Sequence, residues 1–125
     1  MTLLLDTHAL LWAIGKPDEL RPETRSAIVD PGTAVLVSAA STWEIAIKRA
    51  RGKLETPADL AGALADADFT TLPITVEHSL AAGGLPLHHR DPFDRMLIAQ
   101  AQLGKLTVVT RDPHFSLYDV DVLAA

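Results

Sequence analysis

Short apolar runs alternate along this chain with longer stretches that carry helix signals, and this alternation restricts the fold more than any other feature. Apolar runs of this length are typical of buried strands, whereas the stretches between them have caps and helical periodicity. We predict strands at residues 2–5, 34–38, 69–72, 107–110 and 120–123, with the last as a weaker edge strand. The order of elements therefore predicts an α/β domain with a central, mainly parallel sheet of about five strands.

Helix caps mark where the connecting segments should begin and end. The pattern predicts helical segments around residues 6–14, 22–29, 41–52, 56–67, 75–82 and 91–104. Ser41 and Glu44 have the spacing of a capping box, and Thr56 is the expected cap of the next helix. Asp91 precedes Pro92 and should cap the last one, which we expect to end at Gly104.

Length, charge and cysteine content narrow the possible functions. The chain has 125 residues, enough for one domain with its own core, and no cysteine, so only oxygen and imidazole remain as metal ligands. Its first apolar run is broken at Asp6 and follows no basic segment, so we expect no signal peptide, no membrane span and a cytoplasmic protein. A formal net charge of −5 argues against wrapping nucleic acid through a general basic surface.

Four acidic residues stand close to the ends of predicted strands. Asp6 follows the first strand, Glu44 lies in the turn-to-helix after the second, and Asp112 follows the fourth. Asp94, in the first turn of the helix leading into the fourth strand, would have to reach the same edge from its own side. The carboxyl ends of parallel strands share one edge, where open α/β folds bind ligands. Clustered carboxylates there would suit Mg²⁺ or Mn²⁺, and such a cation can activate water for phosphodiester hydrolysis.

Each of these acids also has a structural interpretation. Glu44 could close the capping box, and Asp94 could interact with the dipole of its helix. Asp91 and Asp112 each precede a proline and could serve only as N-caps. Asp6 is harder to explain in this way, because it interrupts a buried strand run without an obvious partner, and this favours a functional role for it.

Other polar and aromatic residues are weaker candidates. Lys48 stands one turn after Glu44 and suits an ordinary helical ion pair. Trp12 and Trp43, at helical positions, are expected in the core rather than as platforms for stacked bases. The histidines show no pair at metal-ligand spacing on a helix face, so we treat them as non-ligands: His8, His78, His88, His89 and His114.

Four blocks of the sequence resemble those of VapC-type toxins in the PIN-domain family of ribonucleases. These blocks are Leu4-Leu5-Asp6-Thr7-His8, residues 41–46 around Glu44, residues 89–101 around Asp91 and Asp94, and Thr110-Arg111-Asp112. The resemblance extends along nearly the whole chain and implies a single PIN domain over residues 1–125, built as an α/β/α sandwich.

The same resemblance implies a function. It suggests a Mg²⁺ site, with Mn²⁺ as a possible substitute, formed by Asp6, Glu44, Asp94 and Asp112, and endonucleolytic cleavage of single-stranded RNA segments. It also implies a homodimer that is neutralised by a cognate VapB-like antitoxin and meets DNA only indirectly, through that antitoxin. Whether Asp91 assists Asp94 stays open at this level, with Asp94 preferred.

The main alternative is a catalytically silent PIN-like or receiver-like domain that binds a partner protein. Receiver domains also gather carboxylates around Mg²⁺, but the receiver pattern has paired acids after the first strand. In this chain Asp6 stands alone at that place. A haloacid dehalogenase-like phosphatase would need a second aspartate two residues after Asp6, where this chain has His8. The chain has no G-x-G-x-x-G or P-loop stretch, which excludes those nucleotide-binding classes.

Overall fold

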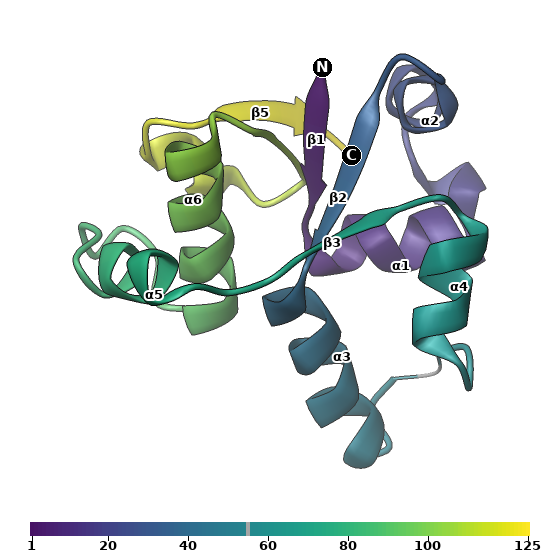
Figure 1. Cartoon of the computed structure of the whole chain (residues 1–125), viewed down its shortest axis with the longest axis horizontal. Helices are drawn as coiled ribbons and strands as arrows, with labels where there is room; N and C mark the ends of the chain where they lie inside the picture. Colours follow the sequence, from purple (N-terminus) through teal and green to yellow (C-terminus); the bar gives the residue numbers. More distant parts are fainter. Residues whose placement is uncertain (55) are drawn as a thin grey trace.

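The computed structural model describes residues 1–54 and 56–125 and has a five-stranded sheet at its centre (Figure 1). Its strands are β1 (Thr2–Leu5), β2 (Ala34–Ser38), β3 (Thr70–Leu72), β4 (Thr107–Thr110) and β5 (Asp121–Ala124). All neighbouring strands pair in parallel, in the order β3-β2-β1-β4-β5. The predicted parallel α/β sheet is thus confirmed, and the limits of β3 and β5 differ from the predicted ones by only one residue.

Helices connect the strands and cover both faces of the sheet. They are α1 (Thr7–Gly15), α2 (Pro22–Val29), α3 (Ala39–Ala50), α4 (Leu60–Asp66), α5 (Val76–Gly83) and α6 (Pro92–Gly104), with short 3₁₀ helices η1 (Pro17–Glu19) and η2 (Pro113–Leu117). In the part of the chain that the structure describes, no helix is both long and apolar enough to cross a bilayer.

Two apolar cores explain the layers. Successive residues of a strand point to opposite faces, so Leu3 and Leu5 of β1 pack with α1, α3 and α4, while Leu4 packs with α6 and η2. All three leucines are fully buried. A strand that is apolar on both faces suits a parallel sheet covered on both sides, and the result is the expected α/β/α sandwich (Figure 1).

Two helix starts differ from the predicted ones. Strand β2 leads directly into α3, and the Ser38 side chain caps this helix by accepting a hydrogen bond from the amide of Ala40 at 3.0 Å. Ser41 therefore lies inside the first turn, and the predicted capping box with Glu44 is wrong. The cap of α4 is Asp59, which accepts from Gly62 N at 3.0 Å, and not Thr56. In both cases a nearer oxygen-bearing side chain satisfies the free amides.

Candidate metal centre

The carboxyl edge of the sheet has a crevice at the point where the winding reverses. From β1 the chain adds β2 and then β3 on one side of the sheet, and it then returns to add β4 and β5 on the other side of β1. The order in which strands are added therefore reverses between the parallel neighbours β1 and β4, and such a reversal opens a crevice at the carboxyl edge. A pocket of about 180 Å³ lies there, lined by Asp6, Thr7, His8, Glu44, Lys48, Asp91, Asp94 and Asp112. All four acids expected to form the site, and Asp91, therefore line one pocket.

Asp6 is fixed on both of its carboxylate oxygens. Oδ1 accepts from the amide of Ala9 at 2.8 Å and so caps α1, and Oδ2 accepts from the Thr110 hydroxyl at 2.6 Å. Asp6 therefore has structural partners, which were not obvious from the sequence. Burial nevertheless raises the pKa of Asp6 above its ordinary value, against the lowering effect of these two hydrogen bonds, and nearby Asp112 adds to the rise.

Glu44 reaches the pocket from the second turn of α3. Its Oε1 accepts from the Thr7 hydroxyl at 2.6 Å, and its Oε2 pairs with Lys48 Nζ at 2.8 Å. The predicted ion pair one turn apart is thus confirmed, although Glu44 itself is buried. Because Thr7 follows Asp6 directly, the hydrogen bond from Thr7 ties the end of β1 to α3.

Asp91 and Asp94 enter from the start of α6 and have different roles. Asp91 caps this helix as predicted, since its Oδ1 accepts from the amides of Phe93 at 2.8 Å and Asp94 at 3.1 Å. Burial and the charges of Asp91, Asp6 and Glu44 together raise the pKa of Asp94 from 3.8 to about 7, although His89 acts to lower it. The other acids of the pocket therefore repel the charged form of Asp94.

Asp112 shares its two oxygens with two histidines. Oδ1 accepts from the amide of His114 at 2.9 Å and lies 2.7 Å from His114 Nδ1, while Oδ2 lies 2.9 Å from His89 Nε2. Burial raises the pKa of Asp112, but the hydrogen bonds from His114 and His89 outweigh it, so the pKa lies below its ordinary value. Asp112 also caps η2, as its structural interpretation predicted.

His89 is the residue that sequence reasoning missed. Its Nε2 lies 2.9 Å from Asp94 Oδ2 as well as from Asp112 Oδ2, and the prediction that the histidines are not metal ligands does not include this contact. No spacing rule could identify it, because it comes from the loop before α6 and meets Asp112 23 residues away along the chain. The one available hint was its position two residues before the predicted cap at Asp91.

The side chains present fit a hard divalent cation. Carboxylate oxygens dominate the lining of the pocket, and oxygen donors are those that Mg²⁺ and Mn²⁺ prefer. Burial is the main cause of the raised pKa of Asp94, and the like charges of Asp91, Asp6 and Glu44 add to it. A cation in the pocket would offset the part that comes from like charge.

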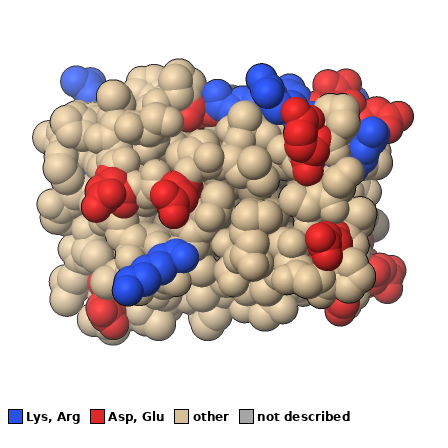
Figure 2. Space-filling model, turned by 90° about the horizontal axis from the view of Figure 1, so that it is seen from above, with Lys and Arg blue, Asp and Glu red and all other residues tan. Residues whose placement is uncertain are grey.

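Two arginines outside the pocket are engaged in structural contacts. Seen from the side on which the chain begins (Figure 2), basic side chains lie in a few separate places and do not cover that face. Arg95 is occupied in the structure, since it donates to the carbonyls of residues 82, 85, 86 and 89 and so holds the loop before α6. Arg111 lies over the ring of Trp12, 4.2 Å from its centroid.

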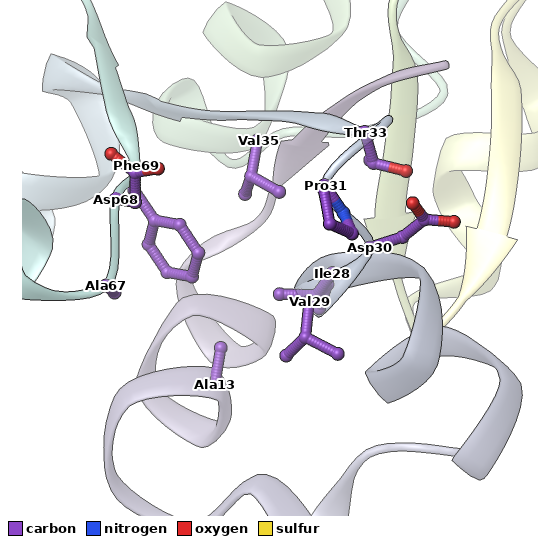
Figure 3. Close-up of a pocket in the computed structure, with 10 residues that line it drawn as sticks. All are labelled: Ala13, Ile28, Val29, Asp30, Pro31, Thr33, Val35, Ala67, Asp68 and Phe69. Atoms are coloured by element: carbon purple, nitrogen blue, oxygen red, sulfur yellow. The ribbon is translucent and has the colours of Figure 1, made fainter.

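A second hollow lies near the amino ends of β2 and β3. It has a volume of about 340 Å³, and Figure 3 shows Ile28, Val29, Val35 and Phe69 among its lining. Only Asp30 and Asp68 carry charge among the residues that line it. A mostly apolar hollow of this kind offers little chemistry, so we place the candidate site at the carboxyl edge.

Trp43 lies beside Glu44 but faces outward. It is 61 % exposed and meets the ring of Phe93 edge to face, with centroids 5.4 Å apart. The prediction that it belongs to the core is therefore wrong, whereas Trp12 does pack against a core cluster.

A family model matches nearly the whole chain, and a known ribonuclease matches part of it. The model of the PIN domain matches residues 3–121. Ribonuclease VapC16 of Mycobacterium tuberculosis is 40% identical over 62 residues, which are 48% of this chain and 44% of that protein, so the match spans less than half of either.

Solved structures share the fold. VapBC2 from Rickettsia felis, bound to a DNA fragment from its promoter, has a TM-score of 0.70 at 14% identity, with 98% of each chain covered. FitAcB from Neisseria gonorrhoeae has a TM-score of 0.67 at 23% identity, covering 98% of this chain and 96% of that one. The α/β/α architecture described above is thus that of these chains.

Proposed function

The chain belongs to the PIN domain family, and on that premise we propose that it is a Mg²⁺-dependent endoribonuclease, a single PIN domain over residues 1–125 that acts as the toxin of a toxin–antitoxin pair. One observation carries the proposal: acids from four separate segments line a single pocket at the reversal point of the sheet. Similarity to a protein named as a ribonuclease supports RNA as the substrate.

In this proposal Asp6, Glu44, Asp94 and Asp112 hold the cation, Mg²⁺ or Mn²⁺. When bound, such a cation makes a coordinated water a better nucleophile and neutralises charge on the phosphate oxygens. The protein fixes the ligand oxygens: Thr110 orients Asp6, and Thr7 orients Glu44. Each hydroxyl leaves further lone pairs on its carboxylate partner available to a cation.

Lys48 has a separate role in the proposed site. Its ammonium group lies 2.8 Å from Glu44 Oε2, lines the pocket and is only half-buried, so it can also meet a phosphate. A cation at the edge of an acidic pocket lowers the electrostatic barrier to an anionic substrate. The net charge of −5 makes such local placement more important than the total.

The proposed partners are an antitoxin and a second copy of this chain. Similar folds occur in toxin–antitoxin complexes, some bound to DNA, which supports an antitoxin partner. In the proposal this chain meets DNA only through that antitoxin. Exposed apolar side chains on and near α5, Val76, Leu80 and Leu87, support a homodimer, because a monomer in water gains nothing from exposing them together. Action on RNA would place the protein in the cytoplasm.

A cleavage assay tests the proposal. Single-stranded RNA should be cut in Mg²⁺ or Mn²⁺ by the wild type, but not in EDTA and not by Asp6→Asn, in which the amide still caps α1. The surface variant Asp119→Asn is the matched control and should cut normally. Cleavage that survives EDTA would refute the metal-dependent mechanism. A folded wild type that cuts no RNA with either metal would favour the silent partner-binding domain.

Expression in cells tests the toxin role separately. The wild-type chain, produced without an antitoxin, should slow growth, and Asp6→Asn should not. Equal slowing by both proteins would mean that the effect does not come from catalysis.

A further inference from the structure

We propose that His89 is a positioning residue, which holds the carboxylates of Asp94 and Asp112 at the separation at which they bind a shared cation. This inference rests on the proposed function, since it concerns the same pocket. The key geometry is that one nitrogen, His89 Nε2, lies 2.9 Å from Oδ2 of both carboxylates. Asp94 belongs to the first turn of α6 and Asp112 follows β4, so the imidazole joins two segments that no strand pairing connects.

The orientation of the imidazole is fixed from several sides. The backbone amide of His89 donates to Tyr118 Oη at 2.9 Å, and the ring meets Phe115 edge to face with centroids 6.0 Å apart. Phe115 is fully buried, so its packing in the core restricts how the His89 ring can turn. The His89 side chain is only 13 % exposed, and these contacts leave its Nε2 directed at the two acids.

The second ring nitrogen identifies which atom carries the proton. The amide of Asp91 donates to His89 Nδ1, at 3.4 Å, which gives Nδ1 the acceptor role and leaves hydrogen on Nε2. His89 therefore faces the carboxylates as a donor. A metal-ligand role would instead require a free lone pair on Nε2, so the geometry favours positioning over direct coordination.

Neighbouring contacts explain why such a donor is needed. Oδ1 of Asp112 is already held by the amide and ring of His114, which leaves Oδ2 as the oxygen that meets His89. The carboxylates of Asp94 and Asp112 both lie 2.9 Å from His89 Nε2, so they are close enough to repel each other. An N–H group that donates to both of them offsets that repulsion. Hydrogen bonds of this kind to metal-binding carboxylates typically change metal affinity by about 10- to 100-fold.

Three substitutions separate positioning from simple packing. His89→Gln places an amide nitrogen close to the position of Nε2, so it can still donate to both acids. His89→Asn is chemically similar but shorter, so its amide reaches only the position of Nδ1, and His89→Leu fills the space without a donor. Asp119→Asn is the control, because Asp119 is exposed and is not among the residues that line the pocket.

The measurement is Mn²⁺ binding by calorimetric titration at a temperature well below the melting point of every variant. We expect the dissociation constant to rise about 10- to 100-fold for His89→Leu and His89→Asn, to stay within about threefold of wild type for His89→Gln, and to be unchanged for Asp119→Asn. Activity is not needed for this readout, so a loss of affinity is separated from any effect on RNA binding.

The outcomes are distinct. If wild type binds Mn²⁺ and His89→Leu binds it equally or more tightly, the positioning role is refuted while the proposed function stands. If His89→Gln is as weak as His89→Leu, the imidazole acts by coordination or packing, and the inference is again wrong. If wild type binds no divalent cation, the proposed function itself fails. Should His89→Leu not fold, the comparison of His89→Gln with His89→Asn decides the same question.

Discussion

Removing the charge of Asp94 should stabilise the protein when no cation is bound. The side chain is 19 % exposed and lies among Asp91, Asp6 and Glu44. Burial raises the pKa of Asp94 to about 7 in the folded protein, so the folded state takes up this proton more readily than the unfolded chain does. Below pH 3.8, the pKa of the unfolded chain, Asp94 is protonated in both states and its charge does not lower the free energy of unfolding. Above about pH 7 Asp94 is ionised in both states, and the buried charge then lowers the free energy of unfolding by its full amount.

The magnitude follows from the gap between these two values. At 1.36 kcal/mol for each pH unit, the penalty at pH 8 has an upper limit of about 4 kcal/mol. Two effects reduce the expected gain for Asp94→Asn to about 2 kcal/mol: water reaches the side chain, and the variant loses the attraction between the Asp94 charge and His89. The second loss is only partial, because asparagine can still accept a hydrogen bond from His89. For a domain of this size, that is a rise of roughly 8 °C in melting temperature.

Thermal melts in EDTA at pH 8 and pH 5 provide the assay, with Asp119→Asn as the control. Asp94→Asn should melt higher than wild type at pH 8, and its advantage should fall to less than half at pH 5, where the folded wild type already carries the proton. Mg²⁺ at ten times its dissociation constant should stabilise wild type by about 1.4 kcal/mol and the variant by less. If the variant melts no higher at pH 8, or keeps its whole advantage at pH 5, the argument from charge clustering is refuted.

Three further outcomes are expected. Glu44→Gln should melt like wild type, because the amide oxygen still accepts from Thr7, but should cut RNA about 100-fold more slowly; unchanged cleavage would leave Glu44 with only a structural role. Asp91→Asn retains its cap on α6 and should lose less cleavage activity than Asp94→Asn, and the reverse order of rates would make Asp91 the ligand. Leu80→Asp, on the exposed side of α5, should shift the protein from dimer to monomer in light scattering, whereas an unchanged mass would place the dimer interface elsewhere or exclude a dimer through this helix.

The strands could be predicted from the sequence because a run of consecutive apolar residues is enough to identify a buried strand. Leu3, Leu4 and Leu5 are apolar on consecutive positions, as a strand buried on both faces requires, and β1, β2 and β4 have the predicted limits. The cap at Asp91 was equally predictable, since a cap needs only an acceptor next to the free amides that it satisfies. The start of α3 was not, because Ser38 and Ser41 both offer a cap and only the exit direction of β2 selects Ser38.

The sequence by itself also determined which acids to consider, since Asp6, Glu44 and Asp112 follow strands whose carboxyl ends share an edge. Only the tertiary structure decided that Asp94 reaches the same pocket, that Asp6 has a partner in Thr110, and that His89 stands between two carboxylates. The physical reason is range. Helical and strand periodicity act between residues a few positions apart, whereas these contacts depend on how α6 and β4 pack across the sheet, and no spacing in the sequence encodes that distance.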